Sequence, residues 1–172
     1  MRKIFLLLVS CLCMSMVYAQ KFEAMPLNEQ GDEYEVRIKN FGKLYKNTFP
    51  EEEWAQPDSL KSGVRGVWRK ACAERLLTPE LKAVLQQVAT LTGGGFWVRF
   101  YVDETGKPIT VTFLMSATVY VNLSTKLLRE IYNLAMKEKL DPSAYLFAEG
   151  DTYAIDAVEL MSRLVEKEDQ KP

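Results

Sequence analysis

Hydrophobic and polar residues alternate from Phe96 to Met115, with a short polar break in the middle. Before the break, one face carries Phe96, Val98, Phe100 and Val102, and the other carries Trp97, Arg99, Tyr101 and Asp103. Alternation with a period of two, in a segment rich in aromatic and β-branched residues, is typical of a half-buried strand. The break, Asp103-Glu104-Thr105-Gly106, ends in a glycine that can take a positive φ, and Pro108 opens the second strand. We therefore predict a β-hairpin at the centre of the fold.

Two further segments favour strands. The segment Glu33 to Lys39 alternates cleanly, with Tyr34, Val36 and Ile38 on one face, and predicts a strand with one solvated side. Near the other end, Thr152 to Ile155 predicts a short strand. Asp156 with Glu159 then resembles a capping box, which predicts a final helix with Ala157, Leu160, Met161 and Leu164 on one side.

Helical periodicity marks three segments between these strands. Ser59 or Asp58 can cap a helix whose apolar positions are Leu60, Val64, Val67, Trp68, Ala71, Cys72 and Leu76. Thr78-Pro79-Glu80 is a strong start signal for a second helix, which carries Leu81, Val84, Leu85 and Val88. Asn122 or Ser124 can cap a third, with Leu127, Leu128, Ile131, Leu134 and Ala135 inward and Asp141-Pro142 as its stop.

These elements predict an α+β fold, in which amphipathic helices pack on a small antiparallel sheet built around the 96–115 hairpin. A chain of 172 residues suits one domain. We expect a flexible lead-in over 20–31, a single α+β domain over 32–166 and a disordered charged tail over 167–172.

The N-terminus has the pattern of a secretory signal peptide. Arg2 and Lys3 precede an apolar run, and small residues end at Ala19, so we expect cleavage before Gln20 and residues 1–19 to be lost. Lipoprotein processing at Cys11 and a retained membrane anchor are the alternatives. After cleavage we expect no stable membrane span, because a span needs about 20 apolar residues.

Cleavage changes the charge and the cysteine count. The chain loses two basic and no acidic residues, so the net charge falls from −1 to −3, and Cys72 is the one cysteine left. A single cysteine forms no internal disulfide. This usage suits a periplasmic, cell-surface or secreted protein of a Gram-negative bacterium. Mild acidity without a basic stripe argues against a nucleic-acid partner.

The sequence contains no histidine, which excludes the commonest general base and every histidine-based nucleophile pair or metal site. Cys72 lies on the inward side of its predicted helix and is best explained as a core residue. The run Gly93 to Gly95 follows a helix and precedes a strand, which is the reverse of a phosphate-binding loop. We expect no catalytic residue, no cofactor and no metal.

Carboxylates are the only remaining candidates for catalysis. Glu51, Glu52, Glu53, Asp103 and Glu104 are available, but no spacing holds two of them across a cleft. The acidic run 51–53 is typical of a solvated segment, and Asp103 is typical of a turn residue that hydrogen-bonds its own backbone. A carboxylate-based hydrolase therefore stays a weak alternative.

The hairpin and its flanks resemble the C-terminal domain of TonB-like envelope proteins. The matching pattern is Val98-x-Phe100-x-Val102-Asp103-x-x-Gly106-Lys107-Pro108-Ile109, with a helix before it and another after it, over about residues 79–140. The resemblance implies an α+β envelope domain that makes protein–protein contact at a strand edge rather than catalysing a reaction. TonB itself also has an N-terminal anchor and a long proline-rich spacer, and the sequence shows neither.

Trp97, Arg99 and Tyr101 are the candidate interaction residues. They share the strand face opposite Phe96 and Val98, and their types are common at interaction hot spots. If a second layer, for example 58–77, covers that face, they are core residues instead. We predict a non-catalytic binding or scaffold domain that contacts an envelope protein or peptide. The alternatives are a glycan-contacting module that stacks sugars on Trp54, Trp97 and Tyr101, and the carboxylate hydrolase.

Overall fold

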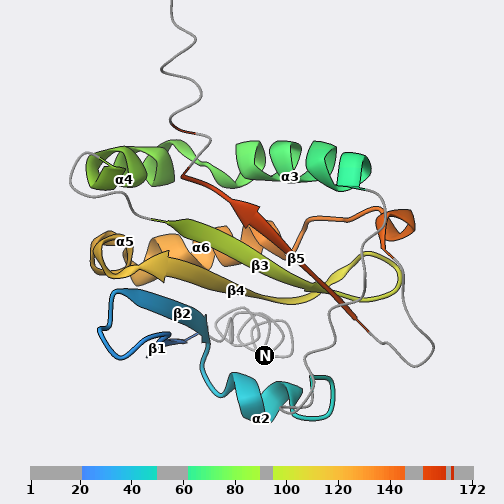
Figure 1. Ribbon diagram of the computed structural model, residues 1–172, viewed down its shortest axis with the longest axis horizontal. Coiled ribbons are helices and arrows are strands. Elements are labelled where there is room, and N and C mark those ends of the chain that lie inside the picture. The colour runs from blue at the N-terminus through green and yellow to red at the C-terminus, as the bar shows by residue number, and fades with distance from the viewer. Residues whose placement is uncertain (1–20, 50–61, 90–94, 146–152, 162–163, 165–172) are drawn as a thin grey trace, which may run out of the picture.

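The computed structural model describes residues 21–49, 62–89, 95–145, 153–161 and 164. They form an α+β fold around a five-stranded antiparallel sheet of order β1-β2-β4-β3-β5 (Figure 1). The strands are β1 (Phe22–Pro26), β2 (Glu33–Ile38), β3 (Phe96–Val102), β4 (Pro108–Ser116) and β5 (Ala154–Glu159). The helices are α2 (Phe41–Tyr45), α3 (Ser62–Leu76), α4 (Pro79–Ala89), α5 (Ala117–Asn122), α6 (Thr125–Ala135) and the 3₁₀ turn η1 (Pro142–Ala144).

The predicted hairpin is confirmed as β3 and β4, the central pair of the sheet. Its register runs from Phe96 opposite Met115 to Tyr101 opposite Thr110, where a bulge shifts the pairing. Gly106 has a φ of 79°, and a Cβ there would lie 2.0 Å from the carbonyl oxygen of Leu140. The turn therefore needs glycine both for its backbone angle and for its close approach to the segment after α6.

The main core lies between the sheet and helices α3 to α6. Trp68 of α3 meets the ring of Phe100 edge-on at 5.2 Å, and Tyr132 of α6 lies 5.9 Å from the ring of Phe22. Side chains from these helices that are fully or almost fully buried include Cys72, Leu76, Leu81, Leu85, Val119 and Ile131. The face of β3 that carries Phe96, Val98, Phe100 and Val102 is therefore the helix-covered face, as the alternation predicts.

The helix starts follow the predicted capping signals. Thr78 accepts a hydrogen bond from the backbone N–H of Leu81, and Ser124 accepts one from that of Leu127. The apolar set predicted for α3 is partly wrong, because Val64 and Val67 are 38% and 75% exposed.

Strand β1 corrects the expectation of an irregular lead-in over 20–31. Phe22 to Pro26 pairs with Ile38 to Tyr34 along the whole strand, so the sheet begins before residue 32. Phe22 and Ala24 lean against the helix-covered core. The strand is held by its pairing with β2, the next strand along the chain, and its own five residues carry too little alternation to predict a strand.

Strand β5 corrects the expectation that Asp156 and Glu159 open a helix. Both residues lie inside a strand that pairs with β3, with Val98 opposite Val158 and Phe100 opposite Asp156. The predicted strand at Thr152–Ile155 is right in kind, but it continues to Glu159. The capping pattern is overridden because alternate residues Ala154, Asp156 and Val158 are buried under α3.

Some predictions fall outside the described residues. The signal peptide over 1–19, the acidic run 51–53, Trp54 and the tail 167–172 belong to this group. Within the described part of the chain, the helices are all too short or too polar to cross a bilayer.

Candidate functional site

The three candidate interaction residues of β3 do not share one environment. Tyr101 is fully buried: Phe49 lies 4.7 Å from its ring centroid, Phe41 5.8 Å and Tyr153 6.3 Å. A second layer thus covers this part of the face, as the alternative interpretation held, and the rings described in it come from α2 and from Phe49 and Tyr153. Tyr101 is thus a core residue and leaves the candidate site.

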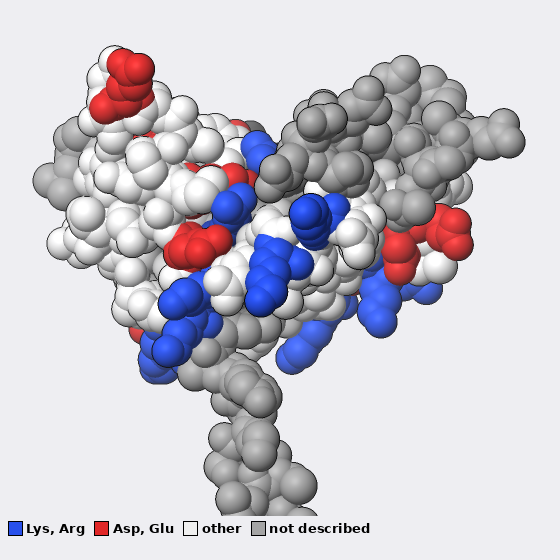
Figure 2. All heavy atoms as spheres, turned by 90° about the horizontal axis from the view of Figure 1, so that it is seen from below, with Lys and Arg blue, Asp and Glu red and all other residues white. Residues whose placement is uncertain are grey.

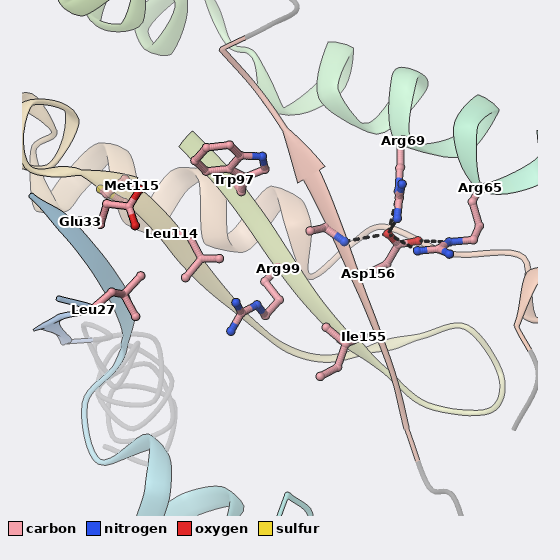
Figure 3. A pocket seen from close by; sticks show the side chains of 11 residues that line it. Leu27, Glu33, Arg65, Arg69, Trp97, Arg99, Leu114, Met115, Ile155 and Asp156 are labelled. Atoms are coloured by element: carbon pink, nitrogen blue, oxygen red, sulfur yellow. Dashed lines mark hydrogen bonds and ion pairs between the residues drawn. The ribbon is translucent and has the colours of Figure 1, made fainter. Parts of the chain in front are cut away.

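Trp97 and Arg99 lie at the uncovered end of the same face. They line a hollow of about 470 Å³ on the sheet surface (Figure 3). Leu27, just after β1, and Glu33, the first residue of β2, form one wall, and Arg65 and Arg69 of α3 with Asp156 of β5 form the other. The floor also includes Leu114, Met115, Ile155 and Ala157. The segment around α2 thus covers only part of this sheet face. The uncovered part is a concave surface with aromatic, aliphatic and arginine side chains.

Asp156 holds the α3 wall of this hollow in place. Arg65 donates from Nε and Nη2 to its two carboxylate oxygens at 3.0 and 3.2 Å, and Arg69 Nε donates at 2.7 Å. Arg69 Nη2 also donates to Oδ1. The Tyr145 hydroxyl donates to Oδ2 at 2.7 Å. One carboxylate thus joins α3, β5 and the segment after η1.

Hydrogen bonds keep the Asp156 carboxylate ionised although it is buried. Burial raises the pKa of Asp156, but hydrogen bonds from Arg65, Tyr145 and Arg69 outweigh it and hold the pKa below its usual value. Burial, with the bond to Asp156, raises the pKa of Tyr145, so its hydroxyl stays protonated and donates. The carboxylate is ionised and fully buried with both oxygens occupied, which suits a structural ion cluster rather than a proton-transfer group.

The same carboxylate closes the outer edge of β5. The hydrogen bond from Leu160 to Phe96 fixes which residues of β5 face β3, so the backbone groups of Ile155, Ala157 and Glu159 point outward. The outward N–H of Ala157 donates to Asp156 Oδ1 at 2.7 Å. This edge is therefore blunted in a way that opposes strand addition.

The opposite edge of the sheet, β1, has a different character. Hydrogen bonds from Leu27 to Glu33 and from Lys39 to Lys21 show that odd-numbered residues of β1 face β2. The backbone groups of Phe22 and Ala24 and the carbonyl of Pro26 therefore point away from the sheet. Within the described part of the chain, no strand pairs with this side.

A groove of about 390 Å³ lies beside that edge. It runs between β1 and the helices α5 and α6. Its lining residues are Phe22, Glu23, Ala24, Val36, Tyr120, Val121, Leu123, Thr125 and Leu128, so it presents both apolar side chains and polar groups. Outward backbone groups and a groove with apolar side chains thus occur together at one edge of the sheet.

Catalytic groups do not converge in the described residues. No group of three or more histidine, cysteine, aspartate or glutamate side chains there is arranged to hold a metal ion. Cys72 is fully buried, and burial raises the pKa of its thiol. Asp103 accepts from the backbone N–H groups of Thr105 and Lys107, as expected of a turn residue. Glu33 and Asp156 both line the hollow but lie on opposite walls (Figure 3).

The sequence contains a signal for the Asp156 cluster, although the capping pattern obscured it. Arg65 and Arg69 are four residues apart, so they share one face of a helix. If residues 154–160 form a strand, every second residue from Ala154 faces the core, and Asp156 is the one charged residue among them. A buried carboxylate needs cationic partners, and the arginine pair supplies them.

Comparisons with known proteins find a likeness among solved structures. The sequence matches no protein-family model and no curated protein. Among solved structures, the chain is similar to a crystal structure of a DUF5043 family protein from Bacteroides uniformis ATCC 8492. The TM-score is 0.48 and the sequence identity 11%, over 81% of this chain and 84% of that chain. A likeness at this level carries no argument about function.

Proposed function

We propose that this protein is an exported, non-catalytic binding domain of the bacterial envelope, which holds an extended peptide segment of another protein along the outer edge of β1. The observation that carries the proposal is that the backbone groups of Phe22 and Ala24 point outward beside a groove with apolar side chains in its lining. An added strand would receive backbone hydrogen bonds from them and place alternate side chains in the groove. The TonB-like pattern at 79–140 supports the same strand-edge mode.

The two edges of the sheet differ in the way that the proposal requires. At β5, Asp156 occupies the outward N–H of Ala157, and α3 lies alongside. At β1, Pro26 lacks an N–H and ends the row of donors, so the edge accommodates a strand of only about five residues. A short open edge limits self-association while allowing a peptide to bind.

The lining of the groove indicates which side chains the bound peptide carries. Phe22 and Ala24 project to the helix-covered side, where Leu123 and Leu128 face them across the groove. A peptide paired with β1 presents every second side chain there. We therefore expect apolar residues at alternate positions of the bound segment.

Selection from a random peptide library, followed by affinity measurement, tests this proposal. We expect the purified protein to enrich peptides with alternating apolar residues. Ala24→Pro removes an outward N–H without removing a bond to β2, so it should weaken the selected peptides about tenfold. Ala24→Ser keeps the N–H and a small side chain, so affinity should stay within about twofold. Equal affinity for both variants would refute strand addition at β1.

The alternative functions have less support. The glycan-contacting alternative needs aligned aromatics, but Tyr101 is buried and Trp54 lies outside the described residues. The hydrolase alternative needs two acids in one cleft. In the hollow, Asp156 is engaged by Arg65 and Arg69 and has a lowered pKa, so it is a poor general acid.

A further inference from the structure

The hollow on the sheet face has features that the strand-edge function does not use. Trp97 and Arg99 project from β3 into it, and Arg65 and Arg69 reach from α3 toward Asp156 at its other side (Figure 3). Its volume of about 470 Å³ is within the range of small-ligand sites, which runs from about 300 to 1,000 Å³. It is separate from the β1 groove, because the two have no lining residue in common.

The lining contains one more cationic than anionic side chain. Its charged residues are Arg65, Arg69 and Arg99 and the two acids Glu33 and Asp156. Arg99 contacts Glu35 at 3.5 Å and interacts with Tyr101, and its side chain is still 31% exposed. Arg69 is 38% exposed although it bonds to Asp156. The space-filling view from below shows Lys and Arg side chains interspersed with Asp and Glu on that side of the molecule (Figure 2), so the charge of the hollow follows from its own lining residues.

Apolar groups lie directly beside these arginines. The indole of Trp97 lies over the backbone of Gly95, where a Cβ would come within 1.9 Å of the ring. Leu114 and Ile155 continue this surface on the neighbouring strands. A ligand that fills the hollow therefore meets guanidinium donors and an aromatic-aliphatic floor at the same time.

We propose that this hollow binds an acidic peptide segment, whose carboxylates pair with Arg99 and Arg69 and whose neighbouring apolar side chain packs on Trp97. Guanidinium groups recognise carboxylates through two parallel hydrogen bonds. Asp156 holds Arg65 and Arg69 in position before a ligand arrives, which reduces the ordering cost of binding. The aliphatic residues Leu114 and Ile155 favour a peptide side chain over an acidic sugar.

Fluorescence anisotropy with defined probes tests this site. The probes are three labelled, end-blocked hexapeptides in which a single leucine lies between runs of glutamate, glutamine or lysine, so that they lack the alternating apolar residues expected of a β1 ligand. At low salt we expect the glutamate peptide to bind at least about tenfold more tightly than the glutamine peptide. The lysine peptide should bind more weakly still, and added salt should weaken the glutamate peptide most.

Two arginine variants localise the effect. Arg99→Gln should weaken the glutamate peptide about tenfold, whereas Arg75→Gln, which removes the same charge from α3 outside the hollow, should change affinity less than about twofold. Trp97→Ala should weaken the glutamate and glutamine peptides alike. In the wild-type protein, the indole N–H signal of Trp97 should shift when the glutamate peptide is added, a readout that does not depend on any variant folding.

Specific results would overturn the proposal. They are equal binding of the glutamate and glutamine peptides, equal effects of Arg99→Gln and Arg75→Gln, or an unmoved Trp97 signal. Oligogalacturonate binding as tightly as the glutamate peptide would replace the peptide with an acidic sugar. Ala24→Pro should leave glutamate-peptide affinity unchanged, so failure here and failure of the strand-edge function are distinguishable.

Discussion

Replacing Asp156 with asparagine removes one negative charge from the cluster that joins α3 to β5. In the wild-type protein the fully buried carboxylate accepts hydrogen bonds from Arg65, Arg69 and Tyr145. The variant leaves two guanidinium groups beside a neutral amide. Removing one partner of a buried ion pair usually costs about 3–5 kcal/mol. Because Arg65 is 17% and Arg69 38% exposed, water offsets part of that cost, and we expect a loss of about 2–4 kcal/mol.

Urea unfolding at pH 7, followed by circular dichroism, measures this loss. The control is Glu23→Gln, which breaks the 3.2 Å pair with Arg37 at a side chain that is 33% exposed. We expect less than about 1 kcal/mol for the control. A free energy of unfolding for Asp156→Asn within about 0.5 kcal/mol of wild type would refute the role given to this carboxylate.

The pH dependence gives an independent check of the same cluster. Burial raises the pKa of Asp156, but the hydrogen bonds from Arg65, Tyr145 and Arg69 lower it below its ordinary value of 3.8. A carboxyl group whose pKa is lower in the folded state stabilises the fold above its unfolded pKa. The stability gap between wild type and Asp156→Asn should therefore be full at neutral pH and shrink below about pH 4. A gap that widens on acidification would contradict this sign.

Three further substitutions or modifications test the fold. Gly106→Ala should lower the free energy of unfolding by at least about 2 kcal/mol, because φ is 79° and the new Cβ would lie 2.0 Å from the Leu140 carbonyl oxygen. The control Gly63→Ala, in open space on α3, should be neutral or slightly stabilising in the same urea assay. Tyr101→Ala should lower the free energy of unfolding by about 3–5 kcal/mol, in contrast to an exposed interaction residue. The thiol of Cys72 should resist alkylation in the native protein and react quickly in urea, because it is buried and its pKa is raised.

The alternation from Phe96 to Met115 specifies the centre of the sheet from sequence alone. Aromatic and β-branched residues on one face, with a turn ending at Gly106, are a local signal, and β3 and β4 follow it. The starts of α4 and α6 were predictable for the same reason, because Thr78 and Ser124 cap helices whose apolar faces lie within the next few residues.

The outer strands depend on contacts that no local pattern contains. β1 is a strand because β2 lies beside it, and β5 is a strand because β3 offers it an edge. At Asp156 a local helix-start signal competes with burial under α3, and the ion cluster with Arg65 and Arg69 decides the outcome. Tertiary packing thus overrides a weak local preference.

The candidate site was predicted in part. Periodicity places Trp97, Arg99 and Tyr101 on one face, which is correct, but it does not reveal which part of that face another segment covers. The rings of Phe41 and Phe49 cover Tyr101 and leave Trp97 and Arg99 beside the hollow. The edge groups of Phe22 and Ala24 could not be found without β1 itself.

Amide hydrogen exchange of β1 distinguishes an occupied from an open strand edge. In the free protein, the outward amides of Phe22 and Ala24 should exchange faster than the inward amides of Glu23 and Met25, which bond to β2. On addition of a peptide selected from the library, the account predicts that Phe22 and Ala24 become protected. Peptide binding that leaves both amides in fast exchange would contradict strand addition at β1.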